Sequence, residues 1–147
     1  ALQDMGMNRF DEGDYEGAFE YWTKAAELGD AHAHFLLSVM YHGGIGVEKD
    51  EKKTLYHLEE AAIGGHDFAR YYLGAIEYEN GNHERAVKHF IIAAKLGDDD
   101  SLDALKGGFK VGLVSKEDFA AALRAHQAAV DATKSPQRAV AEAARKN

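Results

Sequence analysis

The chain has 147 residues, 46% of them hydrophobic, and a formal net charge of −8 at pH 7 without any cysteine. This content suffices for a buried core, but it offers no basic stripe to neutralise phosphates, so nucleic-acid binding is not expected. The absence of cysteine excludes disulfides and thiolate metal sites, and no apolar run approaches the roughly 18 residues of a membrane span.

A helical hairpin is expected over residues 1–29. Its apolar residues recur at spacings of three, four and five, which favours helices of period 3.6 over strands. Asp14 should cap the second helix because a carboxylate accepts hydrogen bonds from the free N–H groups there. Gly29 should end that helix, and the tight connections make neighbouring helices antiparallel.

The same pattern returns over residues 30–65 and 66–97. The anchor residues of successive first helices stand 32, 36 and 32 residues apart: Met5, Leu37, Leu73 and Leu105. An Ala-Ala pair in each second helix repeats at spacings of 36 and 32, beginning at Ala25, Ala61 and Ala93. Both anchors shift by the same four residues, which indicates a duplicated unit with one insert. Such a period is typical of a solenoid.

The insert is the turn of the second unit, Gly43-Gly44-Ile45-Gly46-Val47, which precedes a helix cap at Asp50. The glycines permit backbone angles that other residues avoid, and Ile45 and Val47 can turn back onto the hairpin. A phosphate-binding loop is the alternative interpretation. It is disfavoured because the GxxxxGK[ST] spacing is missing and no strand precedes the turn.

Close helix packing is predicted from small residues opposite bulky ones. In the third unit Leu73-Gly74 stands before Ala86, Phe90 and Ala93 in a tetratricopeptide-like arrangement. A small residue on one helix lets a bulky residue of its partner approach. One repeated position is therefore expected in the core of each of the first three units: Trp22, Leu58 and Phe90.

The fourth unit, residues 98–134, departs from the pattern and is expected to be the C-terminal cap of the solenoid. Lys106 stands where a small residue is expected, and Ser115 with Asp118 predicts a capping box at the start of a long helix. Residues 135–147 should form a short last helix starting at Ser135-Pro136, or a frayed tail.

One motif set carries a family resemblance: Leu37-Ser38, Tyr41, Gly44-Ile45-Gly46-Val47, Lys49-Asp50, Lys53 and Ala61-Ala62-Ile63-Gly64. It resembles the Sel-one-like repeats (SLR), relatives of the tetratricopeptide repeats, closely up to residue 98 and loosely to about residue 130. Units one and three lack the GxGV turn. The resemblance implies an all-α, right-handed solenoid of about four antiparallel helical hairpins. It also implies a non-enzymatic adaptor whose concave groove, lined by the first helices, binds a protein or peptide.

The groove face is expected to be rich in aromatic side chains, which bring a large contact area at a small entropic cost. The predicted partner-binding residues are Met7, Phe10, Phe35, Val39, His42, Phe68, Tyr71 and Tyr78. In the alternative interpretation several of them, Phe10 and Phe68 above all, fill the space between hairpins.

Asp100 and Asp103 are predicted to form a charged end of this groove that attracts a basic flank of the partner. Helix capping and an interaction with the helix dipole are the alternative for Asp98 to Asp100. A second alternative for the chain as a whole is self-assembly into a homo-oligomer through the same face or the solenoid ends.

Catalytic, metal and cofactor sites are not predicted. The sequence has no nucleophile elbow, no cofactor fingerprint and no HExxH pair, and His32 and His34 diverge on a helix. The chain starts at Ala1 inside a helical pattern without an initiator methionine, so we expect a processed or excised piece. A cytoplasmic location is the default expectation, although a signal sequence could have been removed.

Overall fold

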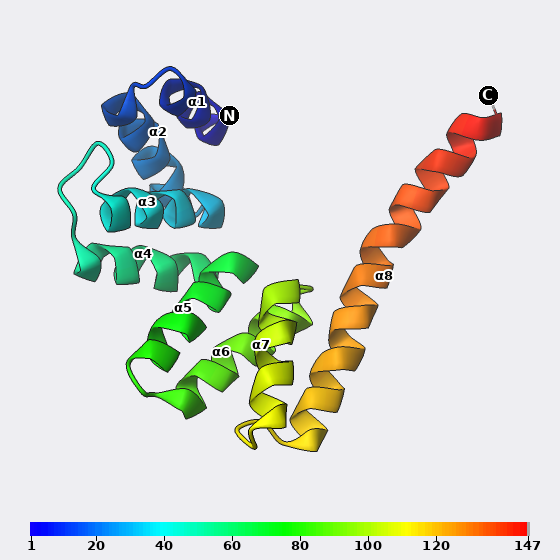
Figure 1. Cartoon of the computed structure of the whole chain (residues 1–147). Helices are drawn as coiled ribbons and strands as arrows, with labels where there is room; N and C mark the ends of the chain where they lie inside the picture. Colours follow the sequence, from blue (N-terminus) through cyan, green and yellow to red (C-terminus); the bar gives the residue numbers. More distant parts are fainter. Residues whose placement is uncertain (147) are drawn as a thin grey trace. The chain divides into compact units, whose positions relative to one another are not determined.

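The computed structural model describes residues 1–146, except for the side chains of Ser135 and Lys146. Over this range the chain is all-α, as predicted, with helices joined by short turns and without strands (Figure 1). The helices are α1 (Leu2–Asp11), α2 (Tyr15–Glu27), α3 (Ala31–Gly43), α4 (Glu51–Ile63), α5 (Asp67–Glu79), α6 (His83–Lys95), α7 (Asp99–Lys110) and α8 (Lys116–Lys146). None of the helices in this range is long and apolar enough to cross a membrane.

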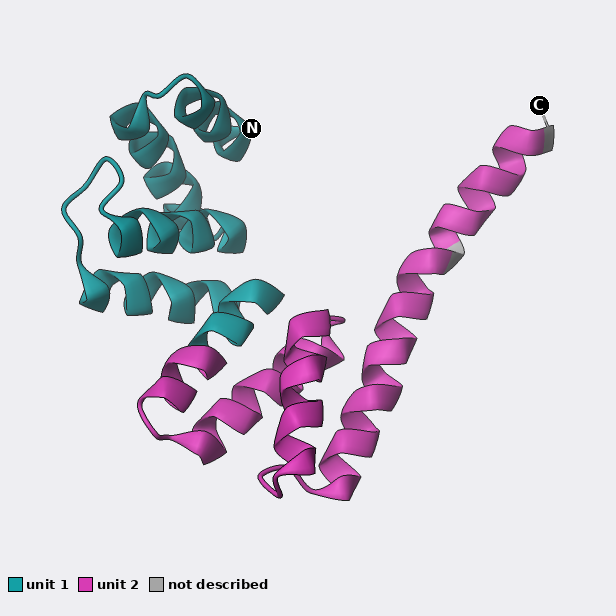
Figure 2. Cartoon of the chain, in the orientation of Figure 1, with its two compact units in different colours: residues 1–73 teal, residues 74–147 magenta. Residues whose placement is uncertain are grey.

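Two compact units make up the chain, Ala1–Leu73 and Gly74–Asn147, and their boundary falls inside α5 (Figure 2). In the first unit α1 packs on α2, α2 on α3, and α3 on α4. In the second unit α6 packs on both α7 and α8, and α7 packs on α8. Packing between consecutive helices is what a solenoid of hairpins requires.

Aspartate side chains cap four of these helices, α2, α3, α4 and α7. The carboxylates of Asp14, Asp30 and Asp50 accept hydrogen bonds from backbone N–H groups three residues ahead, at 2.9, 3.1 and 3.1 Å. These three predicted caps are confirmed. Asp98 caps α7 in the same way at 2.8 Å, and Ser115 accepts from the Asp118 N–H at 3.0 Å at the start of α8. Each bond satisfies one backbone donor that the helix leaves free.

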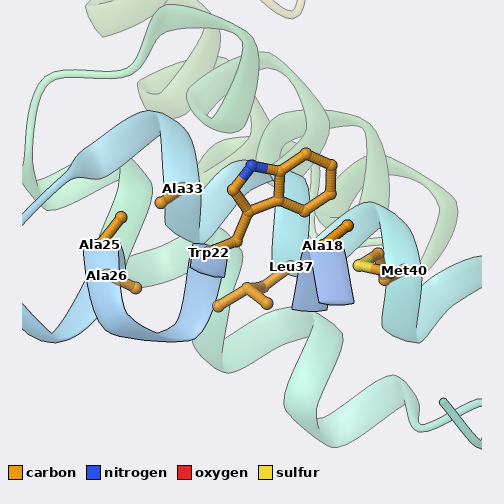
Figure 3. Close-up of a cluster of buried hydrophobic side chains, with 7 residues drawn as sticks. All are labelled: Ala18, Trp22, Ala25, Ala26, Ala33, Leu37 and Met40. Atoms are coloured by element: carbon orange, nitrogen blue, oxygen red, sulfur yellow. The ribbon is translucent and has the colours of Figure 1, made fainter. Parts of the chain in front are cut away.

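The core of the first unit surrounds Trp22, whose side chain is 2% exposed (Figure 3). Its indole Nε1 donates a hydrogen bond to the backbone oxygen of Gln3 at 3.1 Å, and α1 offers Gly6 where the ring approaches. Leu58 and Phe90 are buried at the aligned positions of the next two repeats. The prediction that this repeated position packs in the core is confirmed.

The glycine-rich turn between α3 and α4 follows the predicted design. Gly44 and Gly46 have φ values of +65° and +71°, a region that strongly favours glycine. Ile45 and Val47, between and beside them, pack back against the core of the first unit. A side chain at Gly46 would also meet the backbone of Tyr15, so this turn fixes its place against the preceding hairpin.

The end of the chain corrects one prediction. The sequence predicts a separate short helix from Ser135-Pro136 or a frayed tail, but α8 continues through Pro136 to Lys146. The fixed φ of proline suits a helix, and its missing N–H costs one bond to the carbonyl of Ala132. Because Ala132 is exposed, water can take the place of that bond. Asn147, the last residue of the predicted segment, lies outside the described residues.

Candidate functional site

Five rings gather on one side of α3 and at the start of α5, and we call them the aromatic patch: His32, Phe35, His66, Phe68 and Tyr72. Phe35 lies at its centre, with ring centroids 4.5 Å from His66, 5.9 Å from Tyr72 and 6.3 Å from Phe68. Phe68 and Tyr72 remain 50% and 47% exposed. The structure therefore brings together Phe35 and Phe68, two of the predicted groove residues, with both rings accessible in part.

His66 fixes the geometry of the patch because it also begins α5. Its Nδ1 accepts a hydrogen bond from the backbone N–H of Ala69 at 3.2 Å, so the proton of the neutral ring sits on Nε2. That Nε2–H donates to Nδ1 of His32 at 2.9 Å. Burial and the neighbouring His32 lower the pKa of His66, while Asp67 and Asp30 oppose this shift. The neutral imidazole of His66 thus caps α5 in the way that aspartate side chains cap other helices.

The other predicted groove residues of the first unit lie apart from the patch. Phe10 packs against the core, with its ring 5.7 Å from that of Trp22. Met7 and Val39 are exposed on α1 and α3. His42 Nδ1 lies 3.1 Å from Glu51 Oε1 in an exposed pair near the turn.

Tyr71 adjoins the patch, since its ring lies 5.6 Å from that of Tyr72. Three further predicted residues belong to the second unit. Tyr78 stacks on His83 at 4.6 Å, and Asp100 and Asp103 are exposed on α7. Their part in a shared groove stays a prediction.

A second candidate site lies where α2, α3 and α4 meet, and sequence reasoning missed it. It is an open pocket of about 500 Å³ whose walls include the rings of Phe19, Tyr41 and Tyr56. We call it the α2–α3–α4 pocket. Only Tyr41 of these residues stood out in the sequence, as part of the repeat motif. The others come from different helices, so no local spacing connects them.

A pair of histidines forms part of this pocket. Nδ1 of His34 and Nδ1 of His57 are 2.9 Å apart, and the His57 ring stacks on Tyr41 with centroids 5.6 Å apart. Burial, then His34, then Lys53 lower the pKa of His57 from 6.5 to about 4. His57 is therefore neutral at pH 7, and so adds no positive charge to the pocket.

Acidification is expected to destabilise the first unit through His57. Above pH 6.5 neither the folded nor the unfolded chain is protonated there; between pH 6.5 and about 4 only the unfolded chain binds the proton. The free energy of unfolding should fall across this window, by about 1–2 kcal/mol once the partial exposure of the ring is allowed for. Urea unfolding of His57→Asn should show a smaller pH slope than the wild type. Equal pH slopes for the variant and the wild type would show that His57 does not cause the loss of stability.

Metal binding finds no support in these histidine pairs. Within residues 1–146, no three His, Asp or Glu side chains form a group that could hold a metal ion.

The two units differ in net charge. Residues 1–73 contain 14 acidic and six basic residues, whereas residues 74–147 contain 11 of each, so the net charge of −8 belongs to the first unit.

Comparisons with known structures identify the fold. A protective antigen of uropathogenic Escherichia coli strains, which displays an SLR fold, superposes with a TM-score of 0.70 over 88% of this chain and 30% of its own, at 24% identity. A Sel1 repeat protein from Oxalobacter formigenes gives a TM-score of 0.70 over 86% of this chain and 56% of its own, at 23% identity. Both likenesses establish an SLR solenoid fold.

A curated relative is chitin synthase regulatory factor 4 of Schizosaccharomyces pombe. It is 29% identical over 86 residues, which are 58% of this chain but only 14% of the relative. A model of the Sel1 repeat matches residues 6–30, 31–66 and 67–98. These three matches take in well over half of the sequence, and the chain therefore belongs to the Sel1 repeat family.

Proposed function

We propose that this chain is a non-enzymatic interaction module that binds a protein or peptide segment through the aromatic patch. The observation that carries the proposal is a cluster of rings partly open to solvent, in which Phe35 stacks on Tyr72 and lies tilted against Phe68. Sel1 repeat proteins are generally protein-interaction scaffolds, which supports this class of function.

The patch has the properties of an anchor site. Phe35 is held between its neighbours, and His66 is fixed by its hydrogen bonds to Ala69 and His32. Rings that are already ordered lose little entropy when a partner covers them, and aromatic residues commonly supply most of the binding energy of an interface. Phe68 and Tyr72 would contribute the contact area.

Charge favours a partner with a basic flank. The first unit carries the whole net charge of −8, and such a field attracts cationic segments and accelerates their association. Asp100 and Asp103, exposed on α7 in the second unit, are further acidic candidates for contact with that flank. A regulatory factor among the relatives is consistent with a binding module, whereas chitin synthase belongs to the name of that yeast protein alone.

Phe68→Ala and Tyr72→Ala are expected to weaken the binding of peptides selected on the wild-type chain from a random display library. Loss of a central aromatic anchor typically costs about 2 kcal/mol, or about thirtyfold in Kd. Calorimetric titration measures the change. Because both side chains are about half exposed, the melting temperature should stay nearly constant. The control is Val111→Ala, which truncates an exposed residue of the second unit and should leave the Kd unchanged.

Two results would contradict the proposal. Selected peptides that bind both patch variants as tightly as the wild type would place the binding surface elsewhere. Light scattering at several concentrations tests self-assembly, the alternative named above. A stable dimer that Phe68→Ala dissociates would make the patch a homo-oligomer interface in place of a partner site.

A further inference from the structure

We propose that the α2–α3–α4 pocket is a second binding site, separate from the aromatic patch, which takes the guanidinium group of an arginine side chain from a peptide segment. The inference rests on the proposed function in one respect, that the arginine belongs to a peptide. The residues that carry it are different, so each proposal can fail without the other.

The pocket and the aromatic patch occupy different sides of α3. Successive helix residues are rotated by about 100°, so His34 and Tyr41, two turns apart, share one side. His32 is turned from His34 by about 200° and bonds to His66 at the start of α5. His34 bonds instead to His57 on α4. The two histidines therefore mark two separate surfaces of the first unit.

The walls of the pocket are flat and already ordered. Phe19 meets Tyr41 edge to face at 5.8 Å, Tyr41 lies parallel to His57, and Tyr56 meets His57 at 4.9 Å and 73°. Each ring is thus held by at least one other. A guanidinium group is planar, more weakly hydrated than an ammonium group, and stacks on aromatic faces. A cavity of about 500 Å³ is ample for such a side chain.

Two carboxylates supply the opposite charge. Glu27 on α2 and Glu60 on α4 both line the pocket, and neither has an ion pair or hydrogen bond with a basic side chain in the described part of the chain. A carboxylate accepts two parallel hydrogen bonds from the fork of an arginine. Because the first unit is acidic overall, an anionic ligand group would be repelled from this place.

The positive and titratable groups that face the pocket leave room for this cation. His34 and His57 share a hydrogen bond, and His57 is neutral at pH 7 because its pKa is lowered to about 4. Lys53 is the competing cation, since its Nζ lies 5.4 Å from the centre of the Tyr41 ring. An arriving guanidinium would displace this exposed lysine from the ring. Removal of the lysine charge should therefore strengthen binding.

The test uses the ¹⁵N-labelled whole chain and the peptide Ac-Gly-Gly-Arg-Gly-Gly-amide, followed by NMR titration. Amide shifts are expected around Thr23, Tyr41 and His57. The same peptide with citrulline, which has the shape of arginine without its charge, should bind at least about tenfold more weakly. Shifts confined to the aromatic patch, or equal affinity for the citrulline peptide, would overturn the proposal.

Matched variants separate a specific site from general attraction to an acidic surface. Glu60→Gln should weaken arginine binding by about threefold or more, whereas Glu59→Gln, which removes the same charge from an exposed neighbour outside the pocket, should have much less effect. Lys53→Gln should tighten binding. Equal effects of the two glutamate variants would show a non-specific charge effect and defeat the proposal. Phe68→Ala should leave arginine binding unchanged, so a failure of the aromatic patch proposal remains distinguishable.

Discussion

Replacement of Trp22 by alanine is expected to lower the free energy of unfolding of the first unit by about 3–5 kcal/mol. The indole is 2% exposed and lies against the α1 backbone at Gly6, and its Nε1–H is bonded to the oxygen of Gln3. Alanine would leave a cavity between α1 and α2 and would also remove the hydrogen bond from the indole to that carbonyl. Domains of this size are stable by only about 5–15 kcal/mol, so the loss would be a large part of the total.

The matched control is Trp22→Phe. Phenylalanine keeps an aromatic ring in the space and loses the hydrogen bond, and the aligned residue of the third repeat, Phe90, shows that this position accepts it. We expect a cost of about 1–2 kcal/mol. Because Trp22 is the one tryptophan of the chain, unfolding of the variants should be followed by circular dichroism in urea. A cost below about 1 kcal/mol for Trp22→Ala would show that the indole does not hold the hairpin together.

The fold could be predicted because its signals are local and repeated. Asp14, Asp30 and Asp50 cap helices through residues only three positions away, so the sequence alone contains both partners. The anchors Leu37 and Leu105 are buried as the repeat implies. Met5, at the same aligned position, is 49% exposed because α1 packs mainly on α2 within its unit. A repeat pattern predicts which side of a helix is apolar, but the neighbours decide whether that side is covered.

The candidate sites were harder to predict because they depend on contacts between helices. Phe35 and Phe68 stand two and five residues before the anchor leucines of adjacent repeats, and their place on one face follows from the spacing. The pairing of His34 with His57 does not follow from the spacing, because it depends on how α4 packs against α3. Phe10 has the same aromatic character as Phe35, yet it packs against Trp22. Residue type and spacing therefore indicated an aromatic surface without deciding which rings remain accessible.

Gly74→Ala is expected to destabilise the second unit by about 1–3 kcal/mol, although alanine is the better helix former. A Cβ at this position would lie 2.7 Å from Cε1 of Phe90, a distance that real contacts do not reach. Phe90 is buried between its neighbours and cannot swing away without moving other core atoms. Amide hydrogen exchange of α6 measures the change. The control is Gly107→Ala on α7, where nothing lies within 4 Å of the added Cβ. It should stabilise the helix by about 0.5–1 kcal/mol.

A second substitution separates steric overlap from a general intolerance of Gly74→Ala. The second repeat carries Ser38 and Leu58 at the positions aligned with Gly74 and Phe90, and both are buried. A larger residue on the first helix is thus matched there by a smaller one on the second. Phe90→Leu should cost stability on its own, but it should cost less in the presence of Gly74→Ala, because the shorter side chain removes the overlap. Additive costs of the two substitutions would contradict this mechanism, since residues in contact are expected to couple by about 0.5–3 kcal/mol.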